Sequence, residues 1–478
     1  MDSHTHDLSR HTSVENESHT HEGKAELFRI ALSTEQRQKF FANEGVDPLT
    51  QAFDAKLAIH AGFGGRPVPE ASRAEVLAGL WAHPRKGKTA AYIHVPFCET
   101  HCLYCGFYNR AYRSGESARY TDALLRELAI WREAAPTDTA PIHAVYFGGG
   151  TPTALEAPDL RRLVRGVREA LPLANDCEIT VEGRIHNFSP EKMDACLDAG
   201  ANRFSLGVQT FNTELRRSMR RIADRDTIIE SLSRLRDQDQ AAVIIDLIYG
   251  FPGQSLNDWR KDIEQFLALD LHGVDLYQLN VFRGSPLHDA IEKGDMPPAA
   301  NIPQQAAMFV EGGRIMQEAH YRRLSASHWG RDTRERNIYN HMMKGPSHCL
   351  PFGPGAGGNL FGHFHFVKSD YEGWHEAIAR GQKPIDMLVG PSPNAKLDKT
   401  LAAAFELCRV NLARIGKDFG LPLASIVSPL TEQWERAGLV SCRNGWLELT
   451  TAGEFWQVTM AQLMIDYLHL SSEEEKAS

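Results

Sequence analysis

The chain has no apolar run of 18 or more residues, so its sequence predicts no membrane-spanning helix. Its opening stretch, MDSHTHDLSRHTSVENESHTHEG, has no apolar core and does not look like a secretory signal. A dense Lys/Arg stripe is also missing and the net charge is −9, which argues against nucleic acid as a ligand. We therefore expect a cytoplasmic protein with neither a membrane nor a nucleic-acid partner.

Cysteine is scarce, with 8 in 478 residues, which is too dilute for a disulfide scaffold. Four of these cysteines stand singly in apolar stretches and are predicted to be small buried hydrophobic residues: Cys177, Cys196, Cys408 and Cys442. Three others, Cys98, Cys102 and Cys105, have the spacing C-x3-C-x2-C. Structural zinc normally takes a fourth ligand, whereas three thiolates on a four-iron cluster leave one iron open. The triplet therefore favours a 4Fe-4S cluster over zinc.

Hydrophobic patterning from residue 88 onward predicts strands and helices in alternation. Six strands are expected, at 90–96, 142–150, 178–183, 203–209, 242–250 and 273–282. Repeated β-α units imply a parallel sheet. Polar and glycine residues follow the strands, and in a (β/α) barrel the active site lies at those ends. Six units predict an α/β fold with an open, partial (β/α)6 barrel over residues 88–290.

The cysteine stretch YIHVPFCETHCLYCGFYNR (92–110) resembles the signature of radical S-adenosylmethionine (SAM) enzymes, C-x3-C-x-aromatic-C, with Tyr104 as the aromatic residue. The resemblance implies that the open iron binds the amino and carboxylate groups of SAM. An electron from the cluster then cleaves the sulfonium to a 5′-deoxyadenosyl radical. FGGGTPT (147–153) resembles the glycine motif of that superfamily, which lies along the SAM amino group.

Further segments resemble oxygen-independent coproporphyrinogen III oxidase and the related heme chaperones: EITVEG, LGVQTF, RRIADR and IIDLIYGFPGQS. By this resemblance Tyr92, Gly149 and Glu182 would contact a first SAM. A second SAM or the substrate would be lined by Tyr104, Gly150, Thr151, Gln209, Arg221, Asp246 and Asn280. Two of these roles also follow from the residues themselves. Glu182 and Asp246 stand in otherwise apolar strands, where an unpaired carboxylate is costly, so each is expected to have a ligand or a cation as its partner.

Some of these side chains also have an ordinary structural interpretation. Gln209 could satisfy a neighbouring backbone group. Beside Arg221, the residues Arg216, Arg217 and Arg220 are expected to form a solvated face.

The chain departs from the oxidase pattern at Phe107, where those oxidases carry a further cysteine. The heme chaperones lack that cysteine too, but they would begin close to residue 88. An N-terminal extension, Phe107 and SHWGRDTRERN together resemble the anaerobic heme-degrading radical SAM methyltransferases of the anaerobilin-synthase type. That resemblance implies one or two SAM molecules, heme as substrate, and an electron donor such as a flavodoxin or flavin reductase. Heme would be methylated and opened to a linear tetrapyrrole, with release of iron. A coproporphyrinogen III oxidase and a non-catalytic heme chaperone are the alternatives.

Heme carries two propionates, and arginine suits a carboxylate through its bidentate fork. HWGRDTRERN offers Arg331, Arg334 and Arg336 for this role, and His328 could ligate the heme iron. The alternative is a solvated loop in which the arginines pair with Asp332 and Glu335 and His328 only hydrogen-bonds.

The rest of the chain divides by composition and pattern. We expect a disordered His-rich tail (1–25), an N-terminal helical extension (26–87), a segment for the substrate or second SAM (291–394), and a small helical, winged-helix-like domain (395–470). The last contains a hairpin signal at Asn444-Gly445.

Overall fold

The computed structural model describes residues 32–57, 64–134 and 140–477. The His-rich tail predicted for residues 1–25 lies outside them. Six parallel strands form the centre of the fold: β2 (Thr89–Val95), β5 (Ile142–Gly149), β6 (Leu173–Gly183), β7 (Arg203–Gln209), β8 (Ala242–Tyr249) and β9 (Gly273–Gln278). They are neighbours in chain order, as the sequence predicted.

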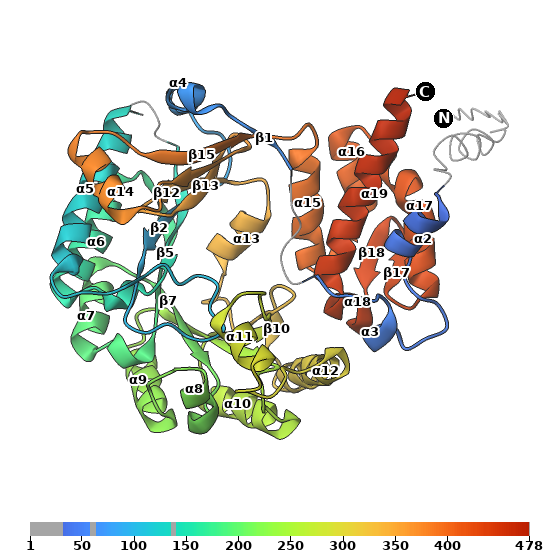
Figure 1. Cartoon of the computed structure of the whole chain (residues 1–478), viewed down its shortest axis with the longest axis horizontal. Helices are drawn as coiled ribbons and strands as arrows, with labels where there is room; N and C mark the ends of the chain where they lie inside the picture. Colours follow the sequence, from blue (N-terminus) through green and yellow to red (C-terminus); the bar gives the residue numbers. More distant parts are fainter. Residues whose placement is uncertain (1–31, 58–63, 135–139, 478) are drawn as a thin grey trace, which may run out of the picture.

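Helices between these strands cover the outer face of the sheet (Figure 1): α5 (Glu116–Ala134), α6 (Ala157–Ala170), α7 (Pro190–Ala199), α8 (Thr213–Ser218), α9 (Arg225–Asp237) and α10 (Leu256–Ala268). The start of α7 is set by its sequence, because the Ser189 side chain accepts a hydrogen bond from Lys192 N and Pro190 occupies the first turn. The helix ends at Gly200, which has φ +100°.

Residues 286–390 extend this sheet at both edges rather than standing apart from it. Beside β2 lie the parallel strand β12 (His348–Phe352) and the antiparallel strands β13 (Gly357–Leu360), β14 (His363–Val367), β15 (Ile385–Gly390) and β1 (Arg66–Pro67). Beside β9 lie β11 (His328–Gly330) and β10 (Arg322–Arg323). The helices of this region are α11 (Pro286–Glu292), α12 (Ile302–Glu318), α13 (Ile338–Lys344) and α14 (Tyr371–Ala379).

The resulting sheet has 13 strands in the order β1-β15-β14-β13-β12-β2-β5-β6-β7-β8-β9-β11-β10. Its two edge strands do not pair with each other, so the barrel is open. A partial α/β barrel is therefore confirmed, with a longer sheet than the six predicted strands.

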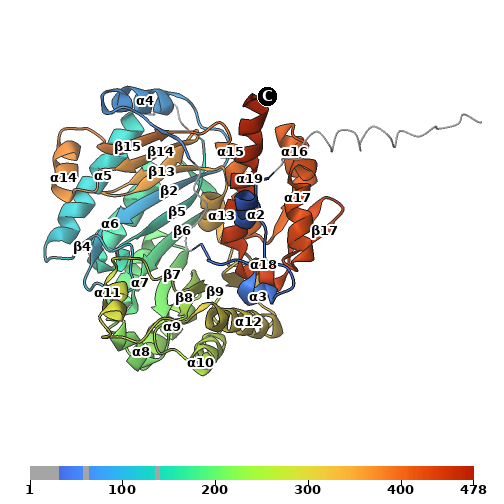
Figure 2. The same ribbon diagram turned by 45° about the vertical axis from the view of Figure 1, so that its right-hand side comes forward.

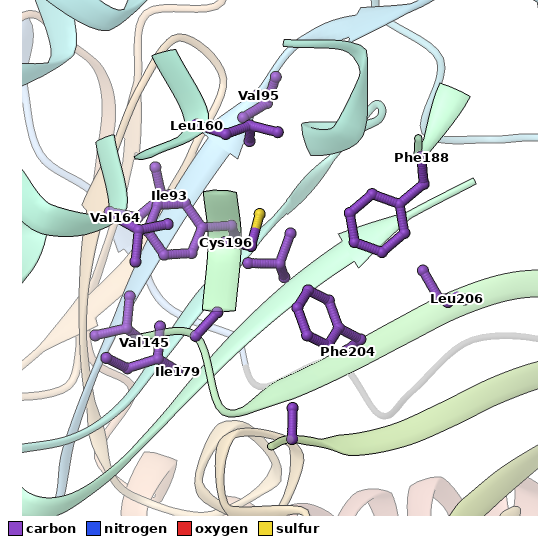
Figure 3. Close-up of a cluster of buried hydrophobic side chains, with 14 of the residues drawn as sticks. Ile93, Val95, Val145, Leu160, Val164, Ile179, Phe188, Cys196, Phe204 and Leu206 are labelled. Carbon is purple, nitrogen blue, oxygen red and sulfur yellow. The ribbon is translucent and has the colours of Figure 1, made fainter. Parts of the chain in front are cut away.

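The main core lies between the strands and the covering helices (Figure 3). Alternate strand residues such as Ile93 and Val145 point outward toward Val164 of α6, and Phe204 lies beside Phe188. Cys196 of α7 is fully buried in the same cluster, which confirms the prediction that it is a packing residue. The opposite residues of each strand are left to face the interior of the barrel.

A second hydrophobic cluster belongs to the C-terminal domain. This domain contains α15 (Ala395–Glu406), β16 (Arg409–Asn411), α16 (Leu412–Phe419), α17 (Leu423–Arg436), β17 (Val440–Arg443), β18 (Trp446–Leu449), α18 (Thr451–Phe455) and α19 (Gln457–Ala477). Asn444 and Gly445 both have positive φ, 51° and 77°, as a two-residue hairpin turn requires. The helices and the hairpin agree with the predicted winged-helix-like module.

The N-terminal extension does not pack as one unit. Helices α2 (Thr34–Phe40) and α3 (Pro48–Gln51) lie against the C-terminal domain, whereas β1 and α4 (Glu70–Ala82) lie at the far edge of the large sheet (Figures 1 and 2). The Trp434 indole donates to Phe40 O at 3.2 Å, and the Trp456 indole donates to Pro48 O at 3.0 Å. Among the helices of the described ranges, none is long and apolar enough to cross a membrane.

Candidate active site

The carboxyl ends of β5 to β9 open into a cavity of about 490 Å³. Cys98, Cys102 and Cys105 all line it. So do eight of the residues predicted to contact SAM or substrate: Tyr104, Gly149, Gly150, Glu182, Gln209, Arg221, Asp246 and Asn280. The structure therefore brings the cysteine loop and most of the predicted ligand contacts to one place.

Strand periodicity explains how the cavity wall is built. On β7 the cavity residues are Ser205, Gly207 and Gln209, which alternate with core residues. On β8 and β9 they include Asp246 and Asp275, which are register partners on adjacent parallel strands. Because successive side chains of a strand point to opposite faces, polar residues two apart are collected in the barrel interior.

Each cysteine thiol has a neighbour that positions it. Cys98 Sγ lies 3.4 Å from Thr151 Oγ1, and Phe107 N–H donates to Cys105 Sγ at 3.3 Å. Arg221 Nη1 donates to Cys102 Sγ at 3.6 Å. Burial raises the pKa of Cys98 and Cys105 above the ordinary thiol value.

At Cys102 burial also acts to raise the thiol pKa. The charges of Arg221 and Arg184 outweigh it, however, and hold that pKa below its ordinary value. A thiolate is the form that binds a metal, so Cys102 is the cysteine best prepared for ligation.

The donor set fits an iron–sulfur cluster. Three soft thiols converge on one end of a cavity whose walls supply two guanidinium groups, from Arg184 and Arg221. Among the described residues no three His, Cys, Asp or Glu side chains meet at one point as ligands of a single metal ion do. A four-iron cluster instead distributes three thiolates over three different irons.

The glycine turn after β5 brings backbone close to the cysteine loop. Gly150 N–H donates to Val95 O at 2.8 Å, and a Cβ at Gly150 would lie only 2.5 Å from Phe97 O. Gly149 has φ +108°, a conformation that side-chain-bearing residues rarely adopt. Glycine is thus needed here both for the turn and for the close approach.

Two carboxylates in the cavity wall have strongly shifted pKa values. Burial, assisted by the charge of Asp246, raises the pKa of Glu182 to about 8, although a backbone hydrogen bond from Gly149 opposes the shift. Burial and the charge of Asp275 raise the pKa of Asp246 to about 7. No cationic side chain among the described residues offsets the charge of Glu182, which suits a cationic ligand.

Gln209 has a strained backbone in the cavity wall. Its φ is 73°, at a register shift between β7 and β8 that follows Gly207. Its side-chain Oε1 is buried and has no hydrogen-bond partner. A non-glycine residue that lines a cavity in this conformation, with a buried unsatisfied acceptor, favours ligand contact over the ordinary structural role.

Two predicted SAM contacts, Tyr92 and Thr151, do not line the cavity. The Tyr92 ring stacks on Tyr146, which does line it, and the Tyr92 hydroxyl lies 3.1 Å from His94 Nδ1. Thr151 lies behind Cys98, with its hydroxyl beside that thiol. Each of these two residues therefore touches a residue that lines the cavity without lining it itself.

His328 is buried in a chain of charged groups. Its Nδ1 lies 2.8 Å from Asp275 Oδ2, and its Nε2 lies 3.0 Å from Glu335 Oε1. Arg203 completes the chain through Nη2 to the same Glu335 oxygen, at 3.0 Å. Burial lowers the pKa of His328, but the two carboxylates outweigh it and raise the value to about 9. Both ring nitrogens are engaged, so the structure does not support the expectation that His328 ligates iron.

The three arginines expected to bind propionates lie elsewhere. Arg331 pairs with Asp270, Arg334 with Asp239 and Arg336 with Asp176. Asp239 and Asp270 immediately precede β8 and β9, so these pairs stand at the amino ends of the strands, opposite the cavity. The structure does not bring these arginines to the site. Of the alternative pairing, Arg331 does contact Asp332, but the expected partner Glu335 is buried against Arg203 and His328 instead.

The expected solvated face around Arg221 needs one correction. Arg217 and Arg220 are exposed, but Arg216 is buried. Its Nε donates to Ala223 O at 2.6 Å and its Nη1 to Thr210 O at 3.0 Å. Arg216 therefore holds the turn that presents Arg221.

Several cavity residues were not singled out from the sequence. Arg184 follows the end of β6, and its guanidinium donates to Thr100 O and Oγ1 of the cysteine loop, both at 2.9 Å. Its position directly after a strand was the signal that could have identified it. Asp275, Tyr146 and Tyr277 also line the cavity, each at an inward strand position.

Comparisons with known proteins agree with this site. The family model "Radical SAM superfamily" matches residues 92–266. The chain is 41% identical over 441 residues to the anaerobilin synthase of Escherichia coli O157:H7, covering 90% of this chain and 95% of that protein. It is 32% identical to the heme chaperone HemW of Bacillus subtilis (strain 168), over 48% of this chain and 60% of HemW. The coproporphyrinogen III oxidase HemN of Escherichia coli has a similar fold, with a TM-score of 0.71, 19% identity, and coverage of 82% of this chain and 93% of HemN.

Proposed function

Because this chain belongs to the radical SAM superfamily, in the family of the Escherichia coli anaerobilin synthase, we propose that it opens heme. The proposed reaction methylates heme by way of SAM, opens the macrocycle to a linear tetrapyrrole and releases iron without oxygen. A 4Fe-4S cluster and SAM, one molecule or two, are its cofactors.

The observation that best supports a tetrapyrrole substrate is an aromatic rim on the cavity. Phe107, Tyr277 and Phe282 line the cavity and are 79%, 39% and 38% exposed. Large aromatic side chains exposed beside a polar cavity favour a planar, apolar ligand that would cover them. Phe107 stands where coproporphyrinogen III oxidases carry a further cysteine, so this chain has a stacking surface in place of a thiol.

The cysteine loop would hold the cluster through Cys98, Cys102 and Cys105. When bound and reduced, the cluster supplies the electron that cleaves SAM to a 5′-deoxyadenosyl radical. Arg221 and Arg184 favour the thiolate of Cys102 and lie where a negatively charged cluster would stand. The glycine turn at Gly149 and Gly150 leaves its backbone open to a ligand beside that loop.

The SAM cation would lie against the carboxylates. When ionised, Glu182 carries a charge that no described side chain neutralises, and SAM brings a sulfonium cation. Gln209 can accept a hydrogen bond through its unpaired Oε1. Asp246, Arg221, Tyr104 and Asn280 would line the second SAM or the substrate, while Tyr92 and Thr151 would act through their contacts with Tyr146 and Cys98.

The proposal places the enzyme in the cytoplasm, where a flavodoxin or a flavin reductase can supply electrons. It is tested by anaerobic incubation of the reconstituted enzyme with heme, SAM and a strong reductant, followed by absorption spectroscopy and mass spectrometry. Loss of the Soret band, a methylated linear tetrapyrrole and free iron are expected.

Other outcomes would overturn the proposal and point to the alternatives. Heme that stays bound and unchanged would indicate a heme chaperone. A vinyl product formed from coproporphyrinogen III, with heme untouched, would indicate an oxidase.

A further inference from the structure

A second cavity, of about 310 Å³, lies between the barrel and the C-terminal domain. It is lined by residues of β9 and α13 on one side, and by Glu406, Phe455 and Gln457 of the C-terminal domain on the other. It shares five residues with the active-site cavity: Asp275, Tyr277, Gln278, Asn280 and Asn340. The two cavities are therefore neighbours across a common wall that includes Tyr277 of the aromatic rim.

Lys56 projects into this second cavity from the N-terminal segment. Its Nζ hydrogen-bonds to Gln278 Oε1 and lies 3.3 Å from the centroid of the Phe455 ring. No carboxylate pairs with it among the described residues, and burial lowers its pKa to about 7. A half-buried lysine held against an aromatic ring without a counter-ion is costly unless an anion joins it.

The other charged groups of this cavity already have partners. Lys344 pairs with Glu406, which also accepts from Gln457 Nε2 at 3.2 Å. Asp275 pairs with His328 at 2.8 Å, and Glu454 pairs with Arg323. Lys56 is thus the cation left to neutralise a ligand in this part of the described structure.

We propose that Lys56 binds a carboxylate of the tetrapyrrole substrate, with the macrocycle lying over Phe107, Tyr277 and Phe282. This inference rests on the function proposed above. Gln278 lines both cavities and hydrogen-bonds to Lys56, so a propionate that passes the rim at Tyr277 reaches the ammonium group directly. The N-terminal segment thereby supplies a cation for the propionate. The arginines of HWGRDTRERN cannot do so, because they lie at the opposite end of the barrel.

The test is heme titration of the full-length, cluster-loaded protein without SAM or reductant, so that no turnover occurs. Lys56→Met should weaken heme binding about ten- to hundredfold, the range for a lost charge-assisted hydrogen bond, and Lys56→Arg should lose much less. Heme dimethyl ester has no carboxylate charge, so its affinity should be the same for Lys56→Met and wild type.

Lys399→Met is the matched control. Lys399 is buried and, like Lys56, lies over an aromatic ring, 4.3 Å from the Phe364 centroid, but it lines neither of the two cavities. Heme affinity should not change in this variant, and melting temperatures of all variants report any folding loss.

Equal heme affinity in Lys56→Met and wild type would overturn the inference, as would a loss that appears equally with the dimethyl ester. Weakened SAM binding with unchanged heme binding would overturn it too, since the carboxylate would then be that of SAM. These results leave the proposed function intact if wild type still degrades heme. A wild-type enzyme that binds heme through Lys56 but never degrades it would overturn the function alone.

Discussion

Glu182 and Asp246 are carboxylates whose pKa values are raised toward and above neutral pH by burial and by one neighbouring carboxylate each, Asp246 for Glu182 and Asp275 for Asp246. Such groups lower the free energy of unfolding of the ligand-free protein as pH rises, because the unfolded chain releases the proton at a lower pH than the folded protein does. Their placement beside the cysteine loop therefore indicates that ligand binding, rather than folding, accounts for them.

Replacing any one of Cys98, Cys102 and Cys105 with Ala should abolish the cluster and all SAM cleavage, since two thiolates hold a cluster poorly. Iron and sulfide analysis after anaerobic reconstitution measures this, with 5′-deoxyadenosine as the product readout. Cys442→Ser is the control, because Cys442 is half-buried in β17, away from the cavity. A Cys102→Ala protein that kept a reducible cluster would contradict the assignment.

Glu182→Gln should weaken SAM binding by about ten- to hundredfold while leaving the reconstituted cluster intact. The empty variant should also be at least as stable as wild type at pH 8. Between the ordinary carboxylate pKa and about 8, the unfolded chain gives up this proton while the folded wild type retains it, so ionisation costs stability as pH rises.

The pH dependence of SAM binding gives a separate prediction. Wild-type affinity for SAM should increase as pH rises through about 8, the pKa of Glu182, because only the ionised carboxylate attracts the cation. Isothermal titration across that range measures it. The amide of the Glu182→Gln variant has no charge to gain, so the same slope in that variant would assign the dependence to another group.

Single residues could be predicted where a short motif carries the chemistry. The cysteines and the glycine turn are such cases, and they lie together in the cavity. The arginines of HWGRDTRERN were misassigned because their actual partners are distant in sequence: Arg331 bonds to Asp270 across 61 positions and Arg334 to Asp239 across 95. Lys56 lies in no recognisable sequence motif. Its proposed role becomes visible only in the folded protein, where it lines the second cavity.

At the scale of elements, the turn after β5 connects the sheet to the cysteine loop. Gly150→Ala should destabilise the protein by about 1–3 kcal/mol and impair cluster loading, because the new methyl group would collide with the Phe97 carbonyl. Gly79→Ala is the matched control. Gly79 is exposed in α4 with nothing within 4 Å of the added Cβ, so it should gain roughly 0.5–1 kcal/mol. Chemical denaturation compares the two, and a neutral Gly150→Ala would contradict the close approach.

The predicted strands and helices were recovered because buried parallel strands are continuous apolar runs that alternate with amphipathic helices. The outer strands β12 to β15 were not predicted. They are short, contain Gly, His and Pro, and depend on pairing with β2 and β1 rather than on a local pattern. The fold class follows from local sequence, while the width of the sheet follows from long-range pairing.

At the scale of the whole molecule, the N-terminal segment joins the two domains. Its helices α2 and α3 pack on the C-terminal domain, Lys56 reaches the second cavity, and β1 pairs with β15 at the far edge of the large sheet. The substrate site proposed above therefore depends on a connection that the sequence showed only as a helical extension.

Phe40→Ala tests this connection. Phe40 is 3% exposed, and its ring lies 5.5 Å from that of Tyr467, so truncation should cost about 3–5 kcal/mol. Thermal unfolding and limited proteolysis should show a loosened C-terminal domain, together with weaker heme binding through displacement of Lys56. Val46→Ala, at an exposed position of the same segment, should stay within about 0.5 kcal/mol of wild type. If a destabilised Phe40→Ala protein kept its full heme affinity, the result would contradict a contribution of the N-terminal segment to heme binding.

The pairing of Ala42 with Gln433 joins positions 391 apart, with hydrogen bonds of 2.9 and 2.7 Å. A ribosome adds about 5–20 residues per second, so Ala42 waits roughly 20–80 seconds for its partner to be made. Throughout that interval the apolar side chains of the N-terminal segment, Phe40 among them, have no surface to cover them. The nascent chain should therefore depend on chaperones until Gln433 has been translated, and overexpression faster than chaperone supply should yield inclusion bodies rather than misassembled enzyme.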